Sequence, residues 1–145
     1  MTTLRFTFPK AEHLCLQRDI DALFTPESHS LVAFPLRVLV HPVPYEGRGA
    51  KVKVLVSVSK RRFKRAVDRN RAKRQIREAY RLNKHTLLDA IPDGEGLHLG
   101  FVWVSDTAQD SKLVQKRMRT LLQRVAEKIE VRDSLTSKES LTSNP

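Results

Sequence analysis

The feature that most constrains this chain is a strongly basic stretch at residues 60–84, with the sequence KRRFKRAVDRNRAKRQIREAYRLNK. It holds twelve of the 27 Lys and Arg residues of the chain but only two acids, Asp68 and Glu78. Since neither Gly nor Pro occurs from residue 69 until Pro92, the stretch predicts a helix of several turns with Asp68 as its N-cap. The fold must therefore accommodate a long helix that is dense in positive charge.

This predicted helix has two different faces at about 100° per residue. Apolar side chains share one arc, which predicts the core face: Ala72, Ile76, Ala79, Tyr80 and Leu87. The neighbouring basic arc contains Arg69, Asn70, Lys73, Arg74, Arg77 and Arg81. Charge runs on helices are usually solvated faces, but such faces mix signs because like charges at i and i+4 repel. Here the basic series at that spacing has hardly any acidic compensation: Arg69, Lys73, Arg77 and Arg81. Arginine forks suit phosphate oxygens, so the basic arc favours a nucleic-acid partner.

The overall charge supports this interpretation. The formal net charge is +11 and the sequence pI is about 10.3, which is typical of proteins that bind nucleic acid or an anionic membrane. Apolar runs fall short of the roughly 18 residues of a membrane span, and residues 1–20 lack a signal-peptide pattern. Cys15 is the only cysteine, which excludes an internal disulfide and a cysteine-cluster zinc site. We expect a cytoplasmic protein without membrane attachment.

The rest of the chain predicts a small domain of helices and strands. Helical spacing indicates a helix at 8–24 and a last helix capped by Asp110 or Ser111, and strand patterns occur at 30–40, 51–59 and 97–105. The first two strands are close enough in sequence to form an antiparallel hairpin. The basic helix lies between the predicted strands at 51–59 and 97–105, which suggests that these two strands are parallel and that the helix forms the crossover between them. Residues 1–131 are predicted to form one domain, followed by a polar, disordered tail at 132–145.

Signs of catalysis by the protein itself are sparse. The five histidines lie in separate segments, where each is predicted to be a surface or edge residue, and the acids are dispersed. No metal-ligand spacing and no carboxylate pair for two-metal phosphodiester hydrolysis is apparent. We therefore expect no catalytic residue, no metal site and no cofactor in the protein.

Two motifs carry a resemblance to a known family. Ser57-Val58-Ser59-Lys60 is followed by Ala66-Val67-Asp68-Arg69-Asn70-Arg71-Ala72-Lys73-Arg74, and then by Ile76, Arg77 and Tyr80. Together they resemble the signature of the bacterial ribonuclease P protein subunit, in which an Arg-Asn-Arg helix follows a strand ending in a basic turn. The resemblance spans roughly residues 5–130, and its specific part is 55–81.

The resemblance implies an α+β fold. The family has a single small domain with a mixed sheet of about four strands, packed with helices in the order α-β-β-β-α-β-α. Its β-α-β crossover is left-handed, as in the second domain of ribosomal protein S5, whereas general rules favour a right-handed crossover. The handedness is therefore implied by the resemblance alone.

The resemblance also implies a function. In the family, the RNA subunit cleaves the 5′ leader from precursor tRNA with bound Mg²⁺, and the protein binds the catalytic RNA and the leader. The implied contacts to the catalytic RNA and nearby leader are Lys60, Arg61, Arg62, Arg69, Asn70, Arg71, Lys73, Arg74, Arg77 and Arg81. The implied leader cleft contains Ile20, Phe24, Phe34, Leu36 and Arg37. Ile20 stands where the family has an aromatic residue, and an aliphatic side chain lacks a ring face for base stacking.

Two alternatives remain open at the level of sequence. A ribosomal or RNA-chaperone protein could use the same basic helix, since fold and charge alone do not name the RNA. A stand-alone nuclease would cleave precursor tRNA without an RNA subunit. DNA is not an expected partner under any of these interpretations.

Overall fold

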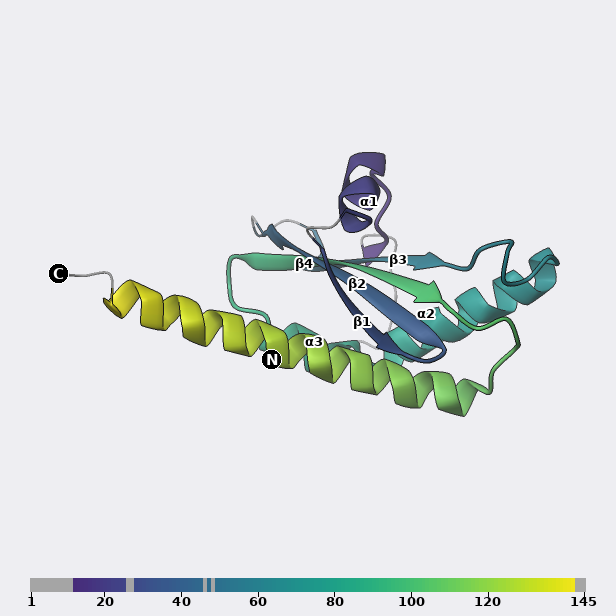
Figure 1. The fold of residues 1–145 in the computed structure, drawn as a ribbon. Helices are drawn as coiled ribbons and strands as arrows, with labels where there is room; N and C mark the ends of the chain where they lie inside the picture. The colour runs from purple at the N-terminus through teal and green to yellow at the C-terminus, as the bar shows by residue number, and fades with distance from the viewer. Residues whose placement is uncertain (1–11, 26–27, 46, 48, 143–145) are drawn as a thin grey trace.

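The computed structural model describes residues 12–25, 28–45, 47 and 49–142, with side chains as far as residue 129. Its elements follow the expected order of helices and strands (Figure 1). They are α1 (Gln17–Leu23), β1 (His29–Ala33), β2 (Leu36–Pro44), β3 (Val52–Ser57), α2 (Ala66–Ala90), β4 (Glu95–Trp103) and α3 (Ser111–Thr142). The predicted α+β class is confirmed.

The four strands form one mixed sheet in the order β1-β2-β4-β3. Strand β4 is antiparallel to β2 and parallel to β3, so α2 forms the crossover between the parallel strands. The predicted hairpin between 30–40 and 51–59 is wrong, because β4 lies between β2 and β3. Because β4 has a neighbouring strand on each side, it is buried along most of its length.

The predicted strand at 30–40 is in fact two strands. Phe34 and Pro35 form a two-residue turn, and Ala33 pairs with Leu36 across it. Proline has no amide hydrogen to donate to a neighbouring strand, so a turn is a favourable place for Pro35. The segment therefore folds back on itself as the β1–β2 hairpin.

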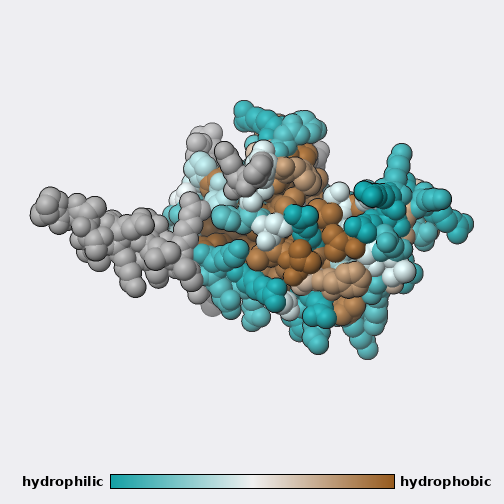
Figure 2. All heavy atoms as spheres, in the orientation of Figure 1, coloured by the Kyte–Doolittle hydropathy of each residue, from teal (hydrophilic) through white to brown (hydrophobic). Residues whose placement is uncertain are grey.

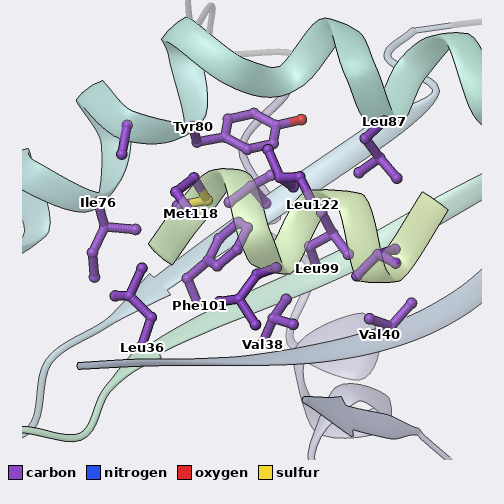
Figure 3. Packing of buried hydrophobic residues seen from close by; sticks show 14 of the residues in the cluster. Leu36, Val38, Val40, Ile76, Tyr80, Leu87, Leu99, Phe101, Met118 and Leu122 are labelled. Carbon is purple, nitrogen blue, oxygen red and sulfur yellow. The ribbon is translucent and has the colours of Figure 1, made fainter. Parts of the chain in front are cut away.

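Helices α2 and α3 cover one face of the sheet and α1 lies on the other (Figure 1). Between the sheet and the two long helices is the main core, shown in Figure 3. The five residues of the predicted core face of α2 are all buried there, which confirms the helical periodicity. The Tyr80 and Phe101 rings pack 5.8 Å apart between centroids.

A smaller apolar cluster holds α1 on the opposite face. Leu23 is fully buried against Leu14 and Leu39, and Ile20 packs beside them. Gly100 of β4 lies beneath, where an added Cβ would be 3.3 Å from Leu23 Cδ1. The glycine therefore allows α1 to approach the sheet closely.

The boundaries of the first two helices differ from the expected ones. Helix α1 begins at Gln17, and the Leu14 amide instead donates to the Val54 carbonyl at 2.9 Å, along the edge of β3. Residues 8–11 of the predicted helix lie outside the described residues. Helix α2 begins at Ala66, so Asp68 is in the first turn rather than at the N-cap. A carboxylate in the first turn interacts favourably with the helix dipole.

Helix α3 begins as expected, since the Val114 amide donates to the Asp110 carbonyl at 3.1 Å. It continues to Thr142 through most of the segment that we expected to be disordered. No Gly or Pro interrupts the sequence between Ser111 and Thr142, so nothing in the backbone chemistry ends the helix earlier. Within the described part of the chain, no helix is both long and apolar enough to cross a membrane.

Candidate nucleic-acid interface

The basic arc of α2 faces away from the core. Asn70, Arg74 and Arg77 are exposed, while Lys73 is half-buried. Arg71, which lies just beyond the arc, is also exposed. Figure 2 shows hydrophilic residues covering the end of the molecule from which α2 projects in Figure 1. The packing of the apolar face thus fixes the direction in which these cations point.

Four of these cations lack an acidic partner in the part of the chain that the structure describes. Among the residues that the structure describes, Arg71, Lys73, Arg74 and Arg77 form no ion pair. Lys73 and Arg77 are also separated by one helical turn, so their like charges repel. A polyanion would relieve this repulsion.

Arg81 differs from the others. Its guanidinium pairs with Glu78, with Arg81 Nε 3.1 Å from Glu78 Oε2, and this hydrogen bond lowers the pKa of Glu78. The expectation of an almost uncompensated basic series is therefore wrong at Arg81. The reason is that a carboxylate three residues earlier lies on the same side of the helix.

Arg69 supports the turn before α2. Its Nη1 donates to the carbonyls of Phe63 and Lys64, both at 2.9 Å. These bonds tie the basic turn at 60–65 to the first turns of the helix. Part of the donor capacity of Arg69 is thus used within the protein, although the family resemblance implies that Arg69 contacts RNA.

The basic turn has two further anchors. The ring centroids of Phe63 and the buried Trp103 are 6.2 Å apart. Arg62 Nη1 lies 2.9 Å from Oδ1 of Asp106, in the loop after β4. Lys60 and Arg61 remain exposed at the turn. The Phe63 and Asp106 anchors could not be predicted from the sequence, because their partners are distant in the chain.

The second part of the candidate interface is a groove beside α1, which we call the α1 groove. It has a volume of about 390 Å³. It is lined by Leu23, Phe24, Thr25, Ser28, Ser30, Arg37, Leu39 and Val102. Phe24 is 54% exposed, and Arg37 Nε donates to Ser30 Oγ at 2.7 Å. An exposed ring and a fixed guanidinium therefore lie along one groove.

The structure corrects the predicted leader cleft at Leu36. Side chains alternate along β2, so Arg37 and Leu39 face α1 while Leu36 and Val38 face the main core. Leu36 is fully buried and points toward α3 in Figure 3. Its assignment to the cleft is wrong.

Two other predicted cleft residues lie apart from the groove lining. Ile20 packs in the small cluster under α1, and Phe34 is exposed at the β1–β2 turn. Thr25, Ser28, Ser30 and Val102 line the groove but were missed by the sequence. The face on which Ser30 lies follows only from the β1–β2 register, in which it is opposite Leu39.

Two histidines lie side by side on the α1 face of the sheet. His41 of β2 is opposite His98 of β4, and His98 is only 8% exposed, so its predicted surface position is wrong. Burial lowers the pKa of His98, which favours the neutral ring. Among the described residues, no group of three or more His, Cys, Asp or Glu side chains is arranged to hold a metal ion.

Together these features define a small α+β domain that presents a cationic helix and turn, together with a groove of mixed polar and apolar lining on the α1 face of the sheet. The chain belongs to the ribonuclease P family: the family model Ribonuclease P matches residues 8–126. It is 43% identical over 122 residues to the ribonuclease P protein component of Porphyromonas gingivalis, covering 83% of this chain and 88% of the relative.

Solved structures agree with this assignment. The ribonuclease P protein from Thermotoga maritima aligns with a TM-score of 0.59 and 26% identity, covering 78% of this chain and 96% of that protein. The protein from Staphylococcus aureus has a TM-score of 0.57 at 20% identity, with 79% and 94% coverage, and shows the common fold.

Proposed function

We propose that this chain is the RNA-binding subunit of ribonuclease P and assists a catalytic RNA in the endonucleolytic removal of the 5′ leader from precursor tRNA. The observation that carries the proposal is a group of cations at the surface of α2 that have no acidic partner among the described residues: Arg71, Lys73, Arg74 and Arg77. Neutralising phosphates with such cations releases counterions from RNA, which favours binding.

The proposal assigns different RNA segments to the two parts of the interface. The basic turn and α2 bind the catalytic RNA and nearby leader nucleotides. In the α1 groove, Phe24 provides a ring face for an unpaired leader base, and Arg37 lies close enough along the groove to contact a leader phosphate. The hydrogen bond from Arg37 to Ser30 restrains the guanidinium before RNA binds, which reduces the conformational entropy lost on binding.

In this proposal the chemistry belongs to the RNA. The RNA subunit binds the Mg²⁺ ions and hydrolyses the phosphodiester bond, while the protein contributes cations and position, and no side chain acts as a catalytic residue. The protein works in the cytoplasm with precursor tRNA, without a membrane or DNA partner.

The test is single-turnover cleavage of a precursor tRNA by a bacterial ribonuclease P RNA at low Mg²⁺, with and without the protein. We expect marked stimulation by the full chain and no cleavage by the protein alone. A variant carrying Arg74→Gln and Arg77→Gln should stimulate less than a charge-matched control carrying Arg18→Gln and Lys128→Gln.

Two results would contradict the proposal. RNA binding without stimulation would favour a ribosomal or RNA-chaperone role. Cleavage by highly purified protein alone would instead indicate a stand-alone nuclease.

A further inference from the structure

A second groove lies between α2 and α3, away from the α1 groove. It has a volume of about 310 Å³. Six of the seven described residues that line it have polar or charged side chains: Asn83, Thr86, Lys116, Arg119, Thr120, Leu122 and Gln123. We call it the α2–α3 groove. The function proposed above does not use it.

The charge of α3 makes this groove cationic. Between Ser111 and Ile129, the helix carries one acid, Glu127, and six basic residues: Lys112, Lys116, Arg117, Arg119, Arg124 and Lys128. Lys116 and Arg119 are both exposed, and neither forms an ion pair within the described residues. The groove therefore has two cations that are not neutralised by acids of the described part of the protein.

Neutral hydrogen-bonding groups accompany the two cations. Asn83 Nδ2 donates to the Ala79 carbonyl at 2.8 Å, which leaves one amide hydrogen and the amide oxygen for a ligand. Thr86 and Gln123 also line the groove, and both residues are exposed. Cations beside amides and hydroxyls suit a sugar-phosphate strand, whose phosphates accept and whose 2′-hydroxyls both donate and accept hydrogen bonds.

The α2–α3 groove and the basic arc lie on different sides of α2. Arg77 and Thr86 are nine residues apart, which at about 100° per residue places them on opposite sides of the helix. An RNA strand that follows Arg74 and Arg77 therefore does not also occupy the groove.

We infer that the α2–α3 groove binds the backbone of a second RNA segment, so that α2 is held between two RNA strands. Lys116 and Arg119 contact phosphates, and Asn83, Thr86 and Gln123 contact the sugar edge. This inference rests on the proposed function, because the ligand is a segment of the RNA that the basic arc also contacts.

The first test measures the salt dependence of binding to a bacterial ribonuclease P RNA. The test variant carries Lys116→Gln and Arg119→Gln, and the charge-matched control carries Arg18→Gln and Lys128→Gln outside the groove. Each lost phosphate contact should reduce the slope of log affinity against log salt by about 0.8. Over a fourfold rise in salt, the test variant should therefore lose about ninefold less affinity than the wild type. A slope equal to that of the control would overturn the inference.

The second test locates the RNA. Cys15 is replaced by Ser, and a single cysteine carrying an iron chelate is placed either by Thr86→Cys in the groove or by Val67→Cys, at the 74% exposed position beside the basic arc. Hydroxyl radicals from the two positions should cut two different segments of the bound RNA. Cuts from the second position alone would overturn the inference.

The two proposals can fail separately. Suppose that the wild type stimulates cleavage of precursor tRNA, but the Lys116→Gln, Arg119→Gln variant has the same salt slope as the control. The inference about the groove would then be wrong, and the proposed function would remain supported. If the wild type neither stimulates cleavage nor binds the RNA, both the proposed function and the inference about the groove would be wrong. Thermal unfolding of each variant distinguishes a lost contact from a lost fold.

Discussion

Lys84 of α2 forms a buried ion pair with Glu12, in which Nζ lies 2.8 Å from Oε1 and 3.0 Å from Oε2. The two residues are 4% and 8% exposed. The pair connects the segment before α1 to the C-terminal half of α2, 72 residues away in sequence. It also belongs to the buried surroundings of Tyr80, whose pKa is raised by burial and by the charge of Glu12.

Removing one partner of this pair should destabilise the protein. Glu12→Gln leaves the Lys84 ammonium in a buried site without its carboxylate, which typically costs about 3–5 kcal/mol. The free energy of unfolding from urea denaturation measures the effect. Asp89→Asn, at an exposed acid of α2, is the control, and an equally small loss in both variants would contradict a stabilising role for the pair.

Phe24→Ala should weaken binding of precursor tRNA with a leader, while binding of mature tRNA changes little. Stacking of a base on an aromatic ring contributes roughly 1–3 kcal/mol, so we expect about a 5- to 150-fold loss for the precursor. Equilibrium binding of both RNAs measures this selectivity. Phe34→Ala is a matched control, because Phe34 is also 54% exposed but does not line the groove. Equal losses for precursor and mature tRNA would remove Phe24 from leader binding.

Leu36→Ala should instead affect stability. Leu36 is fully buried in the main core, and truncation of such a side chain typically costs about 2–5 kcal/mol. We expect a lower midpoint of urea denaturation and no selective loss of leader binding in protein that remains folded. If Leu36→Ala instead weakened leader binding selectively and left the stability unchanged, Leu36 would belong to the leader cleft after all.

Arg74→Gln and Arg77→Gln should each flatten the salt dependence of binding to the catalytic RNA. Each substitution removes one phosphate partner, which should lower the log–log slope by about 0.7–0.9. Titrations at several salt concentrations provide the slope. Arg18→Gln, at an 86% exposed side chain of α1, supplies the control. If neither arginine variant differs from it, the basic arc does not contact phosphates.

The stability of the protein should depend on pH through His98. Burial lowers the pKa of His98 below the ordinary value of 6.5, so the unfolded chain binds a proton more readily than the folded one. The free energy of unfolding should therefore fall as the pH decreases through about 6.5 toward the lowered pKa. His98→Gln should reduce this pH dependence, whereas His29→Gln, at an exposed position, should retain it. Denaturation curves recorded between pH 8 and 5 give the free energy of unfolding at each pH. If His98→Gln shows the same pH dependence as the wild type, His98 does not cause it.

The sequence by itself determined the features that depend on local periodicity. The apolar arc of α2, from Ala72 to Leu87, follows from the 3.6-residue repeat of a helix and is buried as predicted. The strand pattern at 51–59 likewise predicted β3, whose Val52 and Val54 are buried in the main core. The basic arc could be predicted for the same reason, since fixing the buried face of a helix also fixes its exposed face.

Only the tertiary structure decided which distant residues meet. The turn at Phe34–Pro35 reverses the chain, and the β1–β2 register then places Ser30 beside Arg37 and directs Leu36 to the other face. A one-residue change of register would exchange those faces, and no local pattern fixes the pairing. The α2–α3 groove combines Asn83 and Thr86 with Lys116 and Arg119 because the two helices pack side by side on the sheet. Such contacts depend on the packing of the whole domain, so they cannot be derived from either helix alone.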